Sequence, residues 1–312
     1  MKFDADAEKT FLAMREARLP RFETLTPTAA RELLANLRAR AKVEVQPIAS
    51  VEDLHIDGPG GKIPLRIYRP EIKENLAPAL VYFHGGGFVI GNLESHDAVC
   101  RALALAAGVV VVSVDYRLAP EHKFPAGLHD VAAAFTYVHA EAATLGIDHD
   151  RIGVGGDSAG ANLAAVLALM ARDGAIAPIR IQLLACPVLD LTLSHESHAM
   201  DVEGLAVNGS TMRWFRDHYL ESVSVAEDWR ASPLRAESLE GVAPCHLISA
   251  GIDPLCDEAL VYAERLGKAG VRFVHEHYPG QMHGFVTGSL NSPTGKRALA
   301  SIAVSLRAEL SV

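Results

Sequence analysis

A short apolar stretch that runs directly into a predicted helix contains the pattern that most constrains the fold. Residues 152–160 read Ile-Gly-Val-Gly-Gly-Asp-Ser-Ala-Gly, and a helix is predicted to continue through Ala171. The pattern Gly-x-Ser-x-Gly places Ser158 between Gly156 and Gly160, in a turn too tight for flanking side chains. The helix that follows points its positive end at the serine and stabilises negative charge there. The stretch therefore predicts a nucleophilic serine at the end of a strand.

Apolar stretches of strand length alternate with helical stretches along most of the chain. Strands separated by helices of this length predict a mostly parallel, twisted eight-stranded sheet with helices on both faces, which is an α/β fold. Such sheets carry their active sites beyond the carboxyl ends of the strands. The strands are expected at residues 51–56, 63–69, 80–83, 109–114, 152–156, 179–185, 245–250 and 271–275.

Two segments depart from this alternation. Residues 1–42 are predicted to form amphipathic helices, one of which begins at Thr26-Pro27. Residues 191–226 are polar, with a helix expected around 212–219, and an excursion of this length is typical of a lid. The predicted organisation is a helical cap segment at 1–45, a core at 46–190, a cap insertion at 191–226 and the rest of the core at 227–312.

The residue types that acyl transfer needs follow predicted strands. Ser158 offers a nucleophile, Asp253 follows the strand at 245–250, and His283 follows the next strand. In such a triad the histidine takes the proton of the serine, and the carboxylate orients the histidine. The chain order serine, aspartate, histidine is that of α/β-hydrolases. We predict these three residues as a catalytic triad, with Asp257 as the alternative acid that lies further from the strand end.

A run of three glycines follows the predicted strand that ends at residue 83. Gly85, Gly86 and Gly87 let successive backbone N–H groups turn toward one point. We predict that the N–H groups of Gly85 and Gly86, in a loop completed by Gly87, bind the oxyanion of acyl transfer together with the N–H of Ala159. Asp157, next to the nucleophile, is expected to hydrogen-bond a neighbouring loop.

Five motifs carry these candidate residues and span roughly residues 50–290. They are His84-Gly85-Gly86-Gly87-Phe88, Asp115-Tyr116-Arg117-Leu118-Ala119-Pro120-Glu121, Gly156-Asp157-Ser158-Ala159-Gly160, Asp253-Pro254-Leu255 and His283-Gly284-Phe285. Together they resemble the bacterial hormone-sensitive-lipase family of esterases. The resemblance implies an α/β-hydrolase core, a helical cap built from the N-terminal helices and the insertion, and hydrolysis of carboxylic esters without a metal or cofactor. It also implies a preference for short to medium acyl chains.

The motifs and the resemblance predict a serine carboxylesterase that forms an acyl-enzyme on Ser158. Phe88, Trp214 and Phe215 are the candidates for substrate contact, and ordinary packing of a small cap helix is the alternative for the last two. Hydrolysis of amides or formamides with the same triad is the second hypothesis. A non-catalytic receptor is the third, because the plant gibberellin receptors resemble this family. Those receptors lack the histidine of the triad, whereas His283 is present here.

Other motifs have non-catalytic interpretations. His84 is expected to anchor the glycine loop rather than act as a base. His275 and His277 lie in the last predicted strand and are expected to be structural or solvent-facing. His195 and His198 are spaced like metal ligands on a helix, but we interpret them as part of a polar lid and predict no metal.

A dinucleotide-binding turn is the remaining alternative for the central glycines. Gly153 and Gly155 follow a strand and precede a helix, as such a turn requires. Ser158 occupies the third glycine position, however, and no second strand that ends in an acid follows. The pattern therefore favours the nucleophile turn.

Composition limits the compartment and the partners of the 312-residue chain. The net charge of −9, without a basic cluster, argues against nucleic acid. The four scattered cysteines lack a Cys-x-x-Cys pair, the first residues lack a secretory signal, and the longest apolar run, 102–112, is too short for a bilayer. These features predict a cytoplasmic protein with no membrane span that acts on a small-molecule ester. Similar proteins commonly form dimers, which makes a homodimer a candidate assembly.

Overall fold

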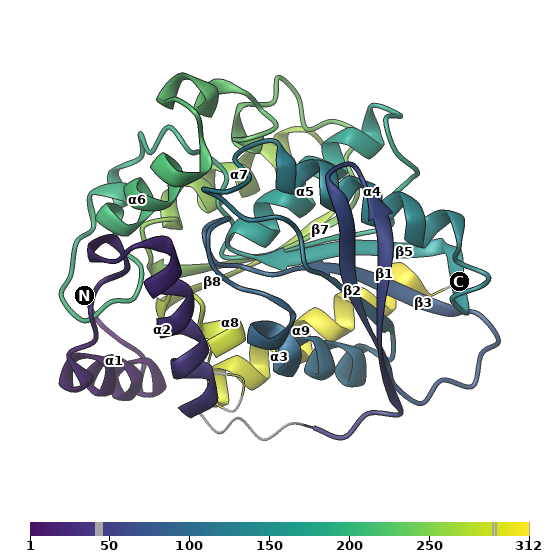
Figure 1. Ribbon diagram of the computed structural model, residues 1–312, viewed down its shortest axis with the longest axis horizontal. Coiled ribbons are helices and arrows are strands. Elements are labelled where there is room, and N and C mark those ends of the chain that lie inside the picture. The colour runs from purple at the N-terminus through teal and green to yellow at the C-terminus, as the bar shows by residue number, and fades with distance from the viewer. Residues whose placement is uncertain (41–45, 289, 291, 312) are drawn as a thin grey trace.

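A single mixed sheet runs through the protein, as a computed structural model shows (Figure 1); it describes residues 1–40, 46–288, 290 and 292–311. The strand order is β1-β2-β4-β3-β5-β6-β7-β8, and only the pairs β1–β2 and β2–β4 are antiparallel. The prediction of a mostly parallel eight-stranded sheet is confirmed. The strands are β1 (Ser50–Gly58), β2 (Gly61–Arg69), β3 (Ala77–Phe83), β4 (Val110–Val114), β5 (Ile147–Asp157), β6 (Gln182–Ala185), β7 (Cys245–Ile252) and β8 (Phe273–Met282).

Helices cover both faces of the sheet because the central strands are apolar on both sides. Every residue of β4, for example, is buried. On one face, α4 (Ala126–Ala140), α5 (Ala159–Arg172) and α7 (Cys256–Lys268) bury their apolar sides against the strands. On the opposite face, α3 (Leu93–Ala107) and α9 (Pro293–Leu310) do the same (Figure 1). The core therefore consists of two apolar layers separated by the sheet.

The N-terminal segment and the insertion lie together at one end of the sheet. Figure 1 shows α1 (Ala5–Ala17), α2 (Pro27–Arg40) and α6 (Gly209–Tyr219) at the same end of the molecule. Glu23 accepts a hydrogen bond from Thr211 at 2.8 Å, and Arg21 donates one to Ser210 at 2.7 Å, so polar contacts join the two segments. The remaining elements are α1 (Ala5–Ala17), η1 (Phe22–Thr24), α2 (Pro27–Arg40), η2 (Glu196–Ala199), α6 (Gly209–Tyr219), η3 (Val223–Glu227), η4 (Pro233–Arg235) and α8 (Phe285–Gly288).

Some element boundaries differ from those predicted. β8 continues to Met282, well beyond the predicted end at residue 275, because Met282 still pairs with Ile252 of β7. β6 begins at Gln182 rather than at residue 179. The predicted helices at 1–42 correspond to α1 and α2, while residues 41–45 of the predicted cap segment lie outside the described residues. Among the helices of the described residues, none has the length and apolar character needed to cross a bilayer.

Candidate active site

Ser158 occupies a strained turn between β5 and α5. Its φ of 54° and ψ of −116° lie in a region that residues other than glycine rarely adopt. A Cβ atom at Gly156 would lie 2.4 Å from the carbonyl oxygen of Phe83, and one at Gly160 would lie 1.9 Å from the same oxygen. Only glycine fits both positions, because β3 passes directly beside the turn. The Gly-x-Ser-x-Gly pattern therefore has the tight geometry that the sequence predicts.

The three predicted triad residues meet at the carboxyl ends of their strands. His283 Nε2 lies 3.1 Å from Ser158 Oγ, and His283 Nδ1 lies 2.7 Å from Asp253 Oδ2. Asp253 is 1% exposed and also accepts a hydrogen bond from the backbone N–H of Leu255. These contacts place a base within reach of the serine proton and a carboxylate behind the base. The alternative acid, Asp257, lies elsewhere and accepts a hydrogen bond from the backbone of Ser197.

The environment of His283 changes the proton affinity of its ring. Burial lowers the pKa of His283, but the negative charge and hydrogen bond of Asp253 outweigh that effect, so the pKa lies above its usual value. Asp157 and Glu258 add further negative charge that acts in the same direction. The site therefore stabilises the protonated imidazole that forms when the serine gives up its proton.

The glycine loop presents backbone N–H groups, although not the set that the sequence predicts. The Gly85 N–H donates to Asp157 Oδ1 at 3.1 Å, so it is already engaged, and its predicted place in the oxyanion hole is wrong. The N–H groups of Gly86 and Gly87 donate to no protein acceptor within the described part of the chain. Ala159 is the first residue of α5, where N–H groups have no partner within the helix. The available donors are therefore those of Gly86, Gly87 and Ala159.

Asp157 fixes the glycine loop through hydrogen bonds to its carboxylate. Besides the Gly85 N–H, its carboxylate accepts a hydrogen bond from Tyr82 Oη at 2.7 Å and lies 3.2 Å from His96 Nε2. Burial raises the pKa of Asp157, but His96 and Tyr82 outweigh burial, and the pKa lies well below its usual value. The expectation that Asp157 hydrogen-bonds a neighbouring loop is confirmed. The sequence did not indicate the contributions of Tyr82 and His96, which come from β3 and α3.

His84 anchors the same loop. Its Nδ1 lies 2.8 Å from the carbonyl oxygen of Gly85, and its ring stacks on Tyr116 with centroids 4.4 Å apart. Burial lowers the pKa of His84 to about 3, so the ring is neutral at pH 7. The interpretation of His84 as an anchor is confirmed.

The other motifs set aside in the sequence also have structural partners. His275 and His277 of β8 both contact the Oγ of Ser249 in β7, at 2.8 and 2.9 Å. A Cβ atom at Gly153 would lie 2.7 Å from the side chain of Ile181, just before β6, and one at Gly155 would lie 2.9 Å from that of Leu183 in β6. These glycines therefore permit close packing within the sheet.

The three predicted substrate-contact residues pack against protein. Phe88 is 2% exposed and stacks on Tyr219, with ring centroids 3.8 Å apart. Phe215 lies so close to the glycine loop that a Cβ at Gly87 would lie 2.2 Å from its ring. Trp214 packs on His218. The contacts fit the alternative interpretation, in which α6 is held against the core by its aromatic side chains.

A cavity of about 210 Å³ lies next to His283, and none of those three aromatic residues lines it. Its walls come from α1, from the insertion and from the end of β8, and they are mostly apolar. The sequence did not indicate the contribution of α1, because nothing local marks a helix surface that faces a cavity. The lining residues are Asp6, Ala7, Thr10, Met14, Leu205, Ala206, Val207, Ile252, Gln281, Met282, His283, Gly284, Phe285, Gly288 and Ser292.

A nucleophilic serine on a strand-to-helix turn, a hydrogen-bonded base and free backbone amides define a serine hydrolase with an α/β sheet. Comparison with known proteins agrees, because the family described as alpha/beta hydrolase fold matches residues 80–287. The chain belongs to this family, in its hormone-sensitive-lipase-like branch, and the resemblance seen in the sequence is confirmed.

Several of the similar proteins are named as esterases. The carboxylic ester hydrolase LipN of Mycobacterium tuberculosis is 41% identical over 261 residues, which cover 81% of this chain and 69% of that protein. Esterase LipI of the same organism is 39% identical, over 88% of this chain and 87% of its own length. A hyperthermophilic esterase from the archaeon Pyrobaculum calidifontis superposes with a TM-score of 0.93 at 39% identity, and the match covers 99% of both chains.

Proposed function

We propose that the protein hydrolyses small carboxylic esters with short to medium acyl chains, through an acyl-enzyme on Ser158. The protein is a serine carboxylesterase, and its similar proteins carry the same class of activity in their names. The observation that carries the proposal is the hydrogen-bonded series from Ser158 through His283 to Asp253, beside free backbone amides. Loss of activity on removal of the Ser158 hydroxyl is the direct test.

Each step of the reaction has a residue in place. Ser158 Oγ attacks the ester carbonyl carbon while its proton passes to His283 Nε2, and the carbonyl oxygen becomes an oxyanion. The amides of Gly86, Gly87 and Ala159 receive this oxyanion. When the tetrahedral intermediate collapses, the bond to the alcohol oxygen breaks and His283 gives its proton to the leaving alkoxide. Water then attacks the acyl carbon of the acyl-enzyme while His283 takes its proton. Collapse of the second tetrahedral intermediate breaks the bond to Ser158 Oγ, which regains a proton from His283, and releases the acid.

The cavity beside His283 supports the proposed size of the substrate. Its volume of about 210 Å³ suits a small apolar group, and its position next to the base places that group on one side of the scissile bond. Met14 of α1 lines the cavity, whereas Leu12 of the same helix is 53% exposed. Met14 and Leu12 therefore offer a matched pair, on the same helix, for testing whether α1 forms a wall of the cavity.

Met14→Trp is expected to narrow the cavity and to lower kcat/KM for esters with a six-carbon chain by about tenfold relative to acetate, because excluding about two methylenes forfeits ~0.8 kcal/mol for each. Two series of substrates, one varied in the acyl chain and one in the alcohol, would show whether the cavity accepts the acyl group or the alcohol group of the ester. Leu12→Trp on the exposed side is the control and is expected to match the wild type. An unchanged chain-length profile in Met14→Trp would contradict the assignment.

The protonation of His283 predicts the pH dependence of activity. The histidine must be neutral to act as a base, and its pKa lies above the ordinary value of 6.5. Activity is therefore expected to fall as the pH drops through that raised pKa. A profile of kcat/KM between about pH 5 and 9 reports the pKa in the free enzyme. A midpoint of the acid limb clearly below pH 6.5 would contradict the proposed environment of His283.

The alternatives receive no such support. No observation favours an amide or formamide substrate over an ester, and the similar proteins named above are ester hydrolases. A non-catalytic receptor is disfavoured because His283 lies within hydrogen-bonding reach of Ser158.

We also propose a helical cap, a homodimer and a cytoplasmic location for this protein. The contacts between η1 and α6 support a cap made of the N-terminal segment and residues 191–226. A homodimer is supported by β8, which lies at the edge of the sheet and pairs with no further strand among the described residues, although the N–H of Asp4 donates to the carbonyl oxygen of Gly280. A cytoplasmic location is supported by the four free cysteines, which suit a reducing compartment.

A further inference from the structure

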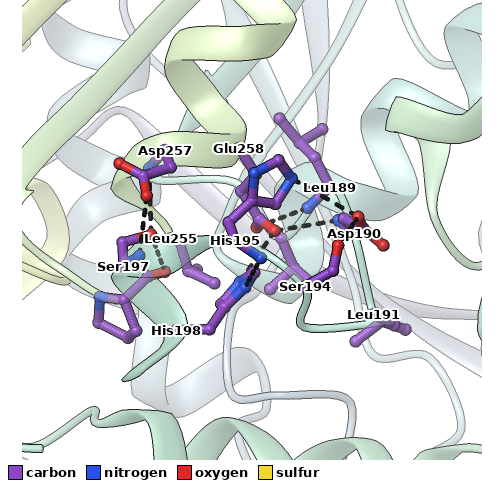
Figure 2. A network of polar contacts seen from close by, with 12 residues as sticks. Leu189, Asp190, Leu191, Ser194, His195, Ser197, His198, Leu255, Asp257 and Glu258 are labelled. Atoms are coloured by element: carbon purple, nitrogen blue, oxygen red, sulfur yellow. Dashed lines mark hydrogen bonds and ion pairs between the residues drawn. The ribbon is translucent and has the colours of Figure 1, made fainter. Parts of the chain in front are cut away.

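A buried polar cluster lies where the insertion meets the start of α7 (Figure 2), and the turn that carries Asp253 directly precedes that helix. Its centre is Glu258, whose side chain is 0% exposed. Glu258 lies in the first turn of α7, and that helix begins directly after the turn Asp253-Pro254-Leu255. A fully buried carboxylate is rare in proteins unless its partners stabilise it, so its contacts require an explanation.

Three donors converge on the Glu258 carboxylate. Its Oε1 accepts the backbone N–H of Leu189 at 2.8 Å, and its Oε2 accepts that of Asp190 at 3.1 Å. His198 Nε2 lies 3.2 Å from Oε2. Because His198 Nδ1 accepts the backbone N–H of His195, Nε2 is the ring nitrogen that carries a proton on the side of Glu258.

The loop that Glu258 holds is the one that supports the nucleophile turn. Val188 immediately precedes Leu189, and its N–H donates to the carbonyl oxygen of Ser158 at 3.1 Å. Asn162 of α5 donates in turn to the carbonyl oxygen of Val188 at 2.9 Å. Glu258 therefore connects the turn that carries Asp253 to the backbone of Ser158.

A second bridge, made by Ser197, runs in parallel to the first and does not involve Glu258. Ser197 of the insertion donates from Oγ to the carbonyl oxygen of Pro254 at 2.8 Å, and its N–H donates to Asp257 Oδ2 at 2.8 Å (Figure 2). Ser197 and His198 both belong to η2. The insertion is therefore fixed to the Asp253 turn at two adjacent points, only one of which carries the buried charge of Glu258.

The charge of Glu258 also reaches the catalytic base. Burial raises the pKa of Glu258 to about 7, against the opposing effect of His198, and above that pH the group is negative. Its negative charge is one of those that raise the pKa of His283. The other titratable and charged groups around the cluster are His195, Asp190, Asp257 and Arg235, and those around His283 are Asp253, Asp157 and Cys186.

We propose that Glu258 is a positioning residue of the esterase reaction, which acts through Asp253 and His283 without touching the substrate. It holds the Asp253 turn against the loop behind Ser158, and its negative charge stabilises protonated His283. The inference rests on the proposed esterase function.

Two substitutions separate the two roles of Glu258. Glu258→Gln keeps the size but removes the charge, so kcat is expected to fall about tenfold with KM changed less than about twofold. The acid limb of kcat/KM is expected to move about 0.5 pH unit lower, because protonated His283 loses a stabilising charge. Glu258→Asp keeps the charge but is too short to reach the loop, so kcat falls while the acid limb stays near its wild-type position.

Further variants serve as controls. Ser197→Ala removes the hydrogen bond to the carbonyl oxygen of Pro254 but keeps the backbone bond to Asp257, and it is expected to lower kcat modestly without moving the acid limb. Glu264→Gln removes an exposed charge from the same helix, where Glu264 pairs with Lys268, and is expected to leave both quantities unchanged. All variants are compared on p-nitrophenyl butyrate as full-length chains, with folding checked by circular dichroism.

The outcomes distinguish the inference from the function on which it rests. A wild-type protein that does not hydrolyse the ester would refute the esterase function itself. An active wild type together with a folded Glu258→Gln that matches it in kcat and acid limb would overturn the role of Glu258. If Glu258→Gln does not fold, His198→Ala takes its place. It removes one donor, raises the pKa of Glu258 and is expected to produce a smaller shift in the same direction, and no shift would overturn the proposal.

Discussion

Ser158→Ala is expected to lower kcat for p-nitrophenyl butyrate by about 10⁴-fold or more, because the acyl-enzyme cannot form without the serine oxygen. The hydroxyl lies 3.1 Å from His283 Nε2, so the substitution removes the atom whose proton His283 would take. The fold should persist, since the substitution removes one partly accessible atom from a turn held by its backbone. The measurement is initial-rate hydrolysis, together with mass spectrometry after treatment with an organophosphate.

The wild type should gain the mass of one phosphoryl adduct at Ser158, and the variant should gain none. Ser222→Ala, which removes an exposed hydroxyl from the insertion, is the control and is expected to keep full activity and labelling. Undiminished hydrolysis by Ser158→Ala, or an adduct on it, would refute the proposed mechanism.

Gly86→Ala is expected to lower kcat by about 10²- to 10³-fold, the effect of losing oxyanion stabilisation. Gly86 has a φ of 121°, which strongly disfavours a side chain, and its Cβ would lie 2.1 Å from the carbonyl oxygen of Ile90. The loop must therefore shift, and the amides of Gly86 and Gly87 shift with it. Steady-state kinetics and the melting temperature are the two measurements needed.

Gly61→Ala is the matched control for this substitution. Gly61 has a φ of 130° at the first position of β2, but no atom lies within 4 Å of its would-be Cβ. Its substitution carries the same backbone strain, about 1–3 kcal/mol, without a steric clash or a role in the site. Equal losses of kcat in the two variants would mean that strain alone explains the effect, against our interpretation of the glycine loop.

The sequence predicts the sheet and the triad well, for one physical reason. Parallel strands place their carboxyl ends at one edge, so residues that follow such strands come together although they lie far apart in the chain. Ser158, Asp253 and His283 all follow strands, and the structure brings them within hydrogen-bonding distance. Apolar runs also locate the strands, while their ends are less certain, as the extension of β8 to Met282 shows.

What the sequence could not indicate depends on contacts between distant segments. Three glycines in a row predict free amides, but only the position of Asp157 decides that the Gly85 amide is taken. Apolar side chains such as Phe88 and Phe215 are equally suited to a ligand or to protein, and packing decides between them. Met14 belongs to the cavity only because α1 lies near the end of β8, and no local pattern encodes that placement.

The cavity walls and the reactive groups are attached to different parts of the molecule. Met14 and Leu205 belong to segments outside the sheet, whereas His283 follows directly from β8. Mutations in α1 or in residues 205–207 can therefore accumulate without disturbing the bond-breaking machinery. These are therefore the positions to randomise in a laboratory selection for new substrates. Natural changes in substrate preference are expected at the same positions.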